Sequence, residues 1–289
     1  PDISPFIASM PPDGLMEIVT TLRRAYEDNP QVQIGVAPHS LRAVSPSMLE
    51  AIVRQVRAPD SRAPVHIHVA EQRREVEECL AWCGRRPVDW LLANAPVDES
   101  WCLVHATHMT GGEIQGLAAS RAVVALCPTT EANLGDGVFP FALFHEAGGR
   151  FGIGSDSNVS VGVSEELRWL EYVQRLHGGR RLVAASRDCP SAGAALYRSA
   201  LAGGRQAVAR PVGRIEAGNR ADWLVLDPSH AGLVGKSGDL LLDAFVFACT
   251  DNPVRDVMVG GKWVVREGAH EREEVMGAAF RDAIVELQK

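Results

Sequence analysis

The sequence predicts an α/β protein that contains part of a (β/α)8 TIM barrel, followed by a small β-sandwich appendage. Three observations support this fold class. Short apolar strands alternate with helical segments at intervals of roughly 30 residues, which is typical of a parallel sheet with right-handed crossovers. Polar side chains follow the carboxyl ends of successive strands, as they do where barrel loops converge on one mouth. No GxGxxG or Walker motif indicates the alternative, a doubly wound sheet.

The predicted elements follow one another in regular order. We expect strands at residues 32–37, 65–70, 102–106, 122–126 and 151–154. We expect helices at residues 13–28, 45–56, 74–95, 112–119, 141–147, 164–176 and 190–210. An eight-stranded barrel takes about 250 residues, and only five strand–helix units are expected here. These units correspond to about strands 4–8 of such a barrel. We therefore expect the sequence to cover part of a longer polypeptide whose earlier part supplies the remaining strands.

The character of the sequence changes after the last of these helices. We assign residues 1–210 to the partial (β/α) barrel and residues 211–270 to a small β-sandwich portion. The strands expected in that portion lie at 223–227, 244–248, 254–259 and 262–265. Residues 271–289 form a C-terminal helix with an apolar stripe, for which we expect a packing role.

Composition limits the possible partners. Lys and Arg number 29 against 36 Asp and Glu, which gives a net charge of −7. That balance argues against nucleic acid or an anionic membrane as the main partner. The six cysteines have neither paired CxxC spacing nor the density of a disulfide scaffold, so we expect reduced thiols in a cytoplasmic protein. As a separate expectation, the protein forms a homodimer.

One strand carries the strongest chemical pattern. In the segment that starts at Val65, alternation sends His66 and His68 to one face, and Glu71 follows just past the strand's end. A His and a Glu at that rim can bind a metal and move a proton in one place. We expect His68 to be a metal ligand and His66 to be a hydrogen-bonded histidine in the barrel interior.

Three further strand ends add to this site. Asp156, after strand 151–154, is the second predicted metal ligand, and His105 ends strand 102–106. The nitrogen and oxygen donors suit one Zn²⁺, and Fe²⁺ or Mn²⁺ remain possible. His39 and Arg42 follow strand 32–37; the planar Arg fork is suited to a carboxylate, which indicates a small anionic substrate.

These motifs resemble the amidohydrolase superfamily. The spacing from His68 to Glu71, then His105, then Asp156 is similar to strands five, six and eight of its mononuclear deaminase branch. More specifically, the sequence resembles members that act on N-formimino-L-glutamate in histidine degradation. The stretches that carry this resemblance are APHSLRAVS, HIHVAEQ, LVHATH, CPTTEANLGDG and GSDSN.

The resemblance implies an activity and residue roles. It implies zinc-dependent hydrolysis of an amidine C–N bond, giving N-formyl-L-glutamate and ammonia, with His68 and Asp156 as zinc ligands. It implies catalytic roles for Glu71, His105 and Asp156, and substrate binding by the residues His39, Arg42 and Ser157. The family's first-strand HxH ligand pair does not occur in this sequence. The alternatives are a deaminase of a purine or other aminated heterocycle, and a metal-free, non-catalytic relative.

Overall fold

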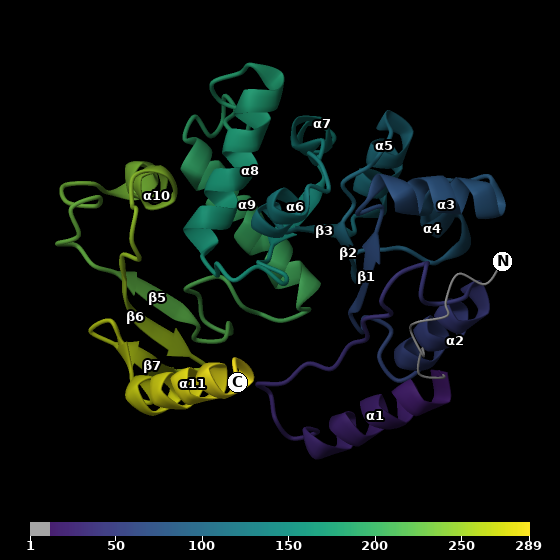
Figure 1. Ribbon diagram of the computed structural model, residues 1–289, viewed down its shortest axis with the longest axis horizontal. Helices are drawn as coiled ribbons and strands as arrows, with labels where there is room; N and C mark the ends of the chain where they lie inside the picture. The colour runs from purple at the N-terminus through teal and green to yellow at the C-terminus, as the bar shows by residue number, and fades with distance from the viewer. Residues whose placement is uncertain (1–11) are drawn as a thin grey trace.

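The centre of the protein is a four-stranded parallel sheet. A computed structural model describes residues 12–289. The strands are β1 (Val65–Val69), β2 (Trp101–His105), β3 (Val123–Leu126) and β4 (Arg150–Ile153), hydrogen-bonded in that order. Since neighbouring strands are parallel, all four carboxyl ends lie at one edge of the sheet, and the predicted α/β class with parallel strands is confirmed (Figure 1).

Helices alternate with these strands and cover the sheet. Thr110 and Glu113 form a reciprocal capping box at the start of α5 (Gly111–Ser120), and Ser45 caps α2 (Pro46–Arg57). The helices of this part are α1 (Pro12–Ala25), α2 (Pro46–Arg57), α3 (Arg73–Cys83), α4 (Pro87–Asn94), α5 (Gly111–Ser120), α6 (Pro128–Leu134), α7 (Phe141–Glu146), α8 (Val163–Gly178) and α9 (Ala192–Ala207). Helix α6 was not predicted from the sequence.

The segment at residues 32–37 does not form the expected strand. It runs beside β1 and pairs only through isolated parallel bridges, Val36 with Val65 and Ser40 with His68. Two features account for this. Pro38 has no N–H to donate, and within residues 12–289 no strand pairs with the segment's other edge. The segment still places residues 39–42 beside the carboxyl end of β1.

The core lies where the sheet meets its helices. Val65, Ile67 and Val69 are each at most 1% exposed and form one face of β1. Helix α9 packs directly on β4, and a Cβ added at Gly203 would overlap the carbonyl oxygen of Phe151. Glycine is therefore required at that position for helix and strand to approach each other. This close packing fixes the position of β4 and of the loop that follows it.

The second sheet is antiparallel and separate from the first. It contains β5 (Trp223–Leu226), β6 (Val254–Val259), β7 (Lys262–Arg266) and β8 (Ala269–His270), in that order. Figure 1 shows β5, β6 and β7 apart from the parallel sheet. The predicted strand at 244–248 is wrong, because those residues belong to α10 (Gly238–Phe247). The continuous apolar run there packs against α8 and α9, and tertiary packing of this kind overrides the β propensity of Phe245 and Val246.

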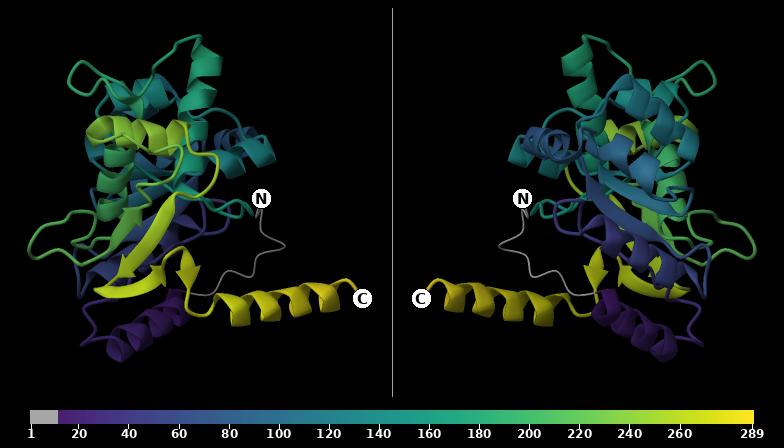
Figure 2. Two further views of the ribbon diagram at one scale, coloured as in Figure 1. Left: turned by 90° about the vertical axis from the view of Figure 1, so that its left-hand side faces the viewer. Right: turned by 90° about the vertical axis from the view of Figure 1, so that its right-hand side faces the viewer.

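The C-terminal helix α11 (Glu273–Leu287) forms as predicted but does not pack as expected. It contains no buried residue, and it projects away from the rest of the chain (Figure 2). Phe280 and Leu287, on the predicted apolar stripe, are 67% and 83% exposed. No helix within residues 12–289 is long and apolar enough to cross a membrane.

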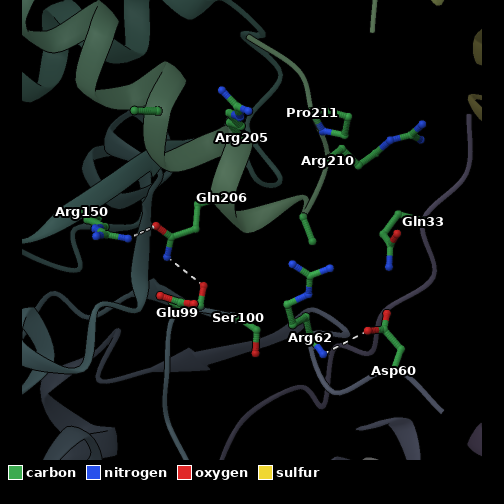
Figure 3. A pocket seen from close by; sticks show the side chains of 12 residues that line it. Gln33, Asp60, Arg62, Glu99, Ser100, Arg150, Arg205, Gln206, Arg210 and Pro211 are labelled. Carbon is green, nitrogen blue, oxygen red and sulfur yellow. Dashed lines mark hydrogen bonds between the residues drawn. The ribbon is translucent and has the colours of Figure 1, made fainter. Parts of the chain in front are cut away.

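A basic hollow lies at the opposite end of the parallel strands. It has a volume of about 500 Å³ and is lined by four arginines together with Asp60 and Glu99, residues that precede β1 and β2 (Figure 3). The arginines are Arg62, Arg150, Arg205 and Arg210. Because active sites of (β/α)8 barrels lie at the carboxyl end of the strands, this hollow is not the candidate site.

Candidate active site

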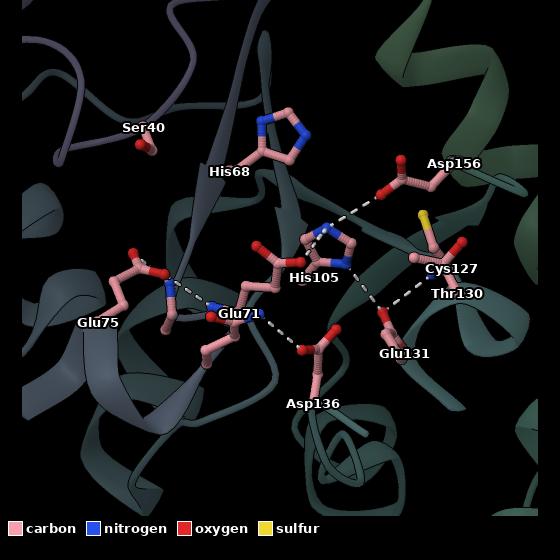
Figure 4. A network of polar contacts seen from close by, with 12 residues as sticks. Ser40, His68, Glu71, Glu75, His105, Cys127, Thr130, Glu131, Asp136 and Asp156 are labelled. Atoms are coloured by element: carbon pink, nitrogen blue, oxygen red, sulfur yellow. Dashed lines mark hydrogen bonds and ion pairs between the residues drawn. The ribbon is translucent and has the colours of Figure 1, made fainter. Parts of the chain in front are cut away.

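Three potential metal ligands meet at the carboxyl edge of the parallel sheet. One ligand atom from each of His68, His105 and Asp156 lies within 4.8 Å of the others (Figure 4). These residues come from the ends of β1 and β2 and from the loop after β4. The sequence predicted the convergence of all three, with His68 and Asp156 as the ligands and His105 as a catalytic group.

The backbone at these strand ends turns sharply. Ala70, His105 and Asp156 all have positive φ angles, of 50°, 68° and 50°. Residues other than glycine rarely adopt this conformation, and such positions concentrate at functional sites. The threonine hydroxyl of Thr130 donates to the carbonyl oxygen of Ser155 at 2.7 Å, which holds the turn that presents Asp156.

His68 has one ring nitrogen committed to a hydrogen bond. Its Nδ1 lies 2.9 Å from the carbonyl oxygen of His39, and because a carbonyl only accepts, Nδ1 carries the proton. In the neutral ring Nε2 therefore keeps its lone pair. A histidine whose other nitrogen donates to a carbonyl is typical of metal ligands. The His39 ring stacks on His68 with a centroid distance of 4.9 Å.

His105 is completely buried and surrounded by carboxylates. Within residues 12–289 its Nε2 has no hydrogen-bond partner, and it lies 3.3 Å from Oδ2 of Asp156 and 3.8 Å from Oε1 of Glu71. Burial opposes the charged ring, but the hydrogen bond to Glu131 and the surrounding negative charges raise the pKa of His105 above its ordinary value.

Glu71 lies between this cluster and a cation. Oε2 of Glu71 is 3.7 Å from the guanidinium of Arg42, and its side chain is 15% exposed. A carboxylate that is partly exposed and beside an imidazole is well placed to carry a proton to or from a substrate. The structure therefore brings Arg42, predicted as a substrate anchor, to the same rim as Glu71.

The other predicted substrate residues lie nearby. Burial lowers the pKa of His39, and the charges of His68 and Arg42 add to that effect. The Nδ1 atom of His39 lies 3.0 Å from the hydroxyl of Ser40. Ser157 is exposed on the turn that carries Asp156. These positions agree with one mouth of the barrel, and the substrate roles of His39, Arg42 and Ser157 stay a prediction.

Two other histidines in these motifs make hydrogen bonds elsewhere. His66 lies two residues deeper in β1, and its Nε2 is 2.9 Å from the carbonyl oxygen of Ala207 in α9. It is the hydrogen-bonded interior histidine that we expected. His108 lies beyond β2, with Nε2 at 2.7 Å from the carbonyl oxygen of Asp136. Neither belongs to the cluster of His68, His105 and Asp156.

Sequence reasoning missed three acidic residues of the site. Glu75 accepts hydrogen bonds from the turn after β1, Glu131 contacts His105, and Asp136 accepts from Gln72 at 3.1 Å. All three are less than a tenth exposed, and one carboxylate oxygen of Asp136 is buried without a partner among the residues that the structure describes. For Glu75 and Glu131 the available signal was their position shortly after the ends of β1 and β3, whereas Asp136 follows α6 and had no such signal.

The donor set fits a divalent metal. Two imidazole nitrogens and a carboxylate oxygen lie close enough to one another to bind the same ion. The buried Nε2 of His105 makes no hydrogen bond within the described part of the chain, so binding a metal would break none there. Zinc prefers this mixture of nitrogen and oxygen, usually with four ligands. Residues 12–289 therefore hold a possible His/His/Asp metal site.

The fold and this site point to the Amidohydrolase family, and sequence comparison agrees. Residues 6–264 match the Amidohydrolase family, and the chain belongs to that family.

Individual relatives resemble the chain over most of its length. The formimidoylglutamate deiminase of Pseudomonas aeruginosa is 49% identical over 95% of this chain and 60% of its own length. A 5-methylthioadenosine/S-adenosylhomocysteine deaminase from Natronomonas pharaonis is 31% identical over 88% of this chain and 57% of its own length. The chain thus spans about three fifths of these relatives.

Solved structures show the same fold. An amidohydrolase from Brucella melitensis superposes with a TM-score of 0.88 at 44% identity, over 97% of this chain and 61% of its own. An adenosine deaminase from Xanthomonas campestris with bound zinc superposes with a TM-score of 0.79 at 24% identity, over 94% of this chain and 62% of its own. Together with the parallel sheet, these matches confirm the predicted amidohydrolase type of α/β fold.

Proposed function

We propose that the protein hydrolyses the formimino C–N bond of N-formimino-L-glutamate, releasing ammonia and N-formyl-L-glutamate. The observation that carries this proposal is the convergence of His68, His105 and Asp156 beside Glu71. The 49% identity to a formimidoylglutamate deiminase supports this substrate over other amidines. We extend the proposal to one Zn²⁺ as the metal, to a homodimer and to a cytoplasmic location.

The zinc ligands in this proposal are His68 and Asp156, with His105 at the same centre. Bound zinc lowers the pKa of a coordinated water so that a nucleophile is available near neutral pH. Further ligands would come from a part of the protein outside these residues. We retain the division into residues 1–210, 211–270 and 271–289 as a proposal; residues 1–11 lie outside the part that the structure describes.

The side chains of the site have distinct tasks in the reaction. The carboxylate of Asp156 accepts a proton from the attacking water. Glu71 delivers a proton to the formimino nitrogen, which leaves as ammonia. His105 faces the carbon under attack, and its ring, once protonated on Nε2, stabilises negative charge there. Glu71 and His105 lie 3.8 Å apart, so both can reach one small reacting group.

In this proposal Arg42 and His39 bind the negatively charged carboxylates of the substrate. The Arg42 guanidinium is about one-third exposed and its nearest carboxylate is Glu71 at 3.7 Å, a longer separation than a direct hydrogen bond. A carboxylate of the substrate can therefore take a bidentate position on Arg42. Ser157 directly follows Asp156 and is exposed, so its hydroxyl is free to contact the same substrate.

Product analysis on the full-length protein tests this function. Metal-loaded protein is incubated with N-formimino-L-glutamate, and ammonia and N-formyl-L-glutamate are quantified. We expect both products in equal amounts. 5-Methylthioadenosine serves as the comparison substrate, and a preference for it would replace the proposed function with the purine alternative. A full-length protein that neither binds zinc nor releases ammonia would be the non-catalytic relative.

A further inference from the structure

Glu131 is a buried carboxylate that contacts the second nitrogen of His105. Nδ1 of His105 lies 3.2 Å from Oε1 of Glu131, whereas Nε2 faces Asp156 and Glu71. The same oxygen of Glu131 accepts the backbone N–H of Cys127 at 3.0 Å. Glu131 is 5% exposed, so water competes little for these contacts (Figure 4).

This contact decides which nitrogen of His105 carries the proton. A carboxylate oxygen that already accepts a backbone N–H acts as an acceptor, so Nδ1 of His105 must donate to it. In the neutral ring the lone pair is then on Nε2. That nitrogen lies in the cluster with His68 and Asp156, where a lone pair can meet a metal or a reacting group.

The opposite tautomer would disable the site. With the proton on Nε2 alone, the lone pair of Nδ1 would face the Glu131 carboxylate, and two acceptors would be buried against each other. Such a pair is unfavourable, because neither buried acceptor has a donor. Glu131 therefore selects one state of His105 out of the two that a free histidine adopts.

We propose that Glu131 is a positioning residue, which holds His105 as the Nδ1–H tautomer and so presents Nε2 to the reacting centre. The effect on turnover rests on the proposed function; the tautomer itself does not. The competing explanation is that Glu131 only caps α6 through Cys127.

The chain offers a matched control for that explanation. Glu166 also holds the start of α6, because it accepts hydrogen bonds from the N–H of Thr129 at 3.0 Å and from its hydroxyl. It is 2% exposed, and its hydrogen bonds go to Thr129 rather than to His105. Loss of Glu166 therefore disturbs α6 without removing the His105 contact.

The experiment compares Glu131→Leu, Glu131→Gln and Glu166→Leu in the full-length protein. ¹⁵N-edited NMR detects the Nδ1–H of His105, assigned by its loss in His105→Asn. We expect the signal in the wild type and in Glu166→Leu, and its loss in Glu131→Leu. Glu131→Gln keeps an acceptor oxygen for both donors, so the signal should persist there.

Steady-state kinetics supplies the second readout. Glu131→Leu should lower kcat about 10- to 100-fold, as loss of a residue that orients a site histidine does elsewhere. KM and zinc content should stay within about twofold of the wild type. Glu131→Gln should recover most of kcat, and Glu166→Leu should lose stability but not turnover.

Several results would overturn the proposal. A bare Nδ1 on His105 in the wild type would do so even if Glu131→Leu failed to fold. Equal losses of kcat in Glu131→Leu and Glu166→Leu would reduce Glu131 to a helix cap. If the wild type does not act on N-formimino-L-glutamate, the proposed function fails, while the NMR comparison still decides the role of Glu131.

Discussion

Glu75 holds Glu71 in place through the backbone: Oε2 of Glu75 accepts the N–H of Glu71 at 3.0 Å, and its Oε1 accepts the N–H of Ala70 at 2.9 Å. Glu75 is 2% exposed and lies in the first turn of α3. A single buried carboxylate thus fixes the left-handed turn at Ala70 and aims the proposed proton carrier at His105. The turn and its cap are one structural unit.

Replacing Glu75 should weaken that unit. In Glu75→Gln an amide group would face one of the two N–H donors, leaving a buried donor without an acceptor. The free energy of unfolding should fall by about 1–3 kcal/mol, and kcat should fall with it because Glu71 is no longer fixed. Urea unfolding measures the first effect. The exposed neighbour Glu77→Gln is the control, and equal stability of the two variants would show that Glu75 does not hold the turn.

Glu71 itself should affect chemistry more than binding. Glu71→Gln keeps the size of the side chain but removes the ability to carry a proton. We expect kcat to fall about 10²- to 10⁴-fold while zinc content stays near that of the wild type. Ammonia release and metal analysis on the same full-length preparation check this. Unchanged turnover would refute the role, and loss of zinc would make Glu71 a ligand instead.

Arg42 should determine the preference for an anionic substrate. Arg42→Ala removes a charge-assisted hydrogen-bond partner worth about 1.5–3 kcal/mol, which corresponds to a rise in KM of about 10- to 100-fold for N-formimino-L-glutamate. A neutral amidine that lacks the carboxylates should be affected much less. If KM rises equally for both substrates, the role of Arg42 lies in its contact with Glu71 rather than in substrate recognition.

The pair of Arg57 and Asp98 should make stability depend on acid pH. Burial disfavours the charged carboxylate, but the Ser100 hydroxyl and the Arg57 guanidinium at 2.9 Å outweigh it, so the pKa of Asp98 lies below its ordinary value of 3.8. Because the pKa of Asp98 is lower in the folded protein than in the unfolded chain, its charge stabilises the fold at pH values above the unfolded-state pKa. That stabilisation is lost as the pH falls through the folded-state pKa.

Asp98→Asn measures that contribution. The variant should be less stable than the wild type at pH 6, and the difference between them should shrink as pH falls below about 4. Chemical unfolding across pH 3–6 provides the comparison. A difference that is independent of pH would mean that the contact of Arg57 with residue 98 does not need the charge.

Much of the architecture could be predicted because strand ends are local signals. The alternation around His68 and the polar residues after each strand located the parallel sheet and its functional edge. The strands predicted at 32–37 and 244–248 were wrong. Strand pairing determined the structure of the first segment, and packing against helices determined that of the second. Whether an apolar run becomes a strand or a helix depends on its neighbours, which a local pattern does not show.

The supporting residues of the site were harder to predict for a physical reason. Glu75 and Glu131 are spaced like ordinary acidic residues in the first turn of a helix, where most carboxylates face solvent. Only the folded chain shows that they turn back to the preceding strand end. The ligand candidates His68 and Asp156 were accessible to sequence reasoning because strand alternation and position determine where they point.

The most direct test of the account is the position of zinc in crystals of the full-length protein, located by anomalous diffraction at the zinc edge. We predict a single site about 2.0–2.2 Å from Nε2 of His68 and from a carboxylate oxygen of Asp156. A zinc ion bound elsewhere, with these two side chains too far apart to share it, would contradict the account.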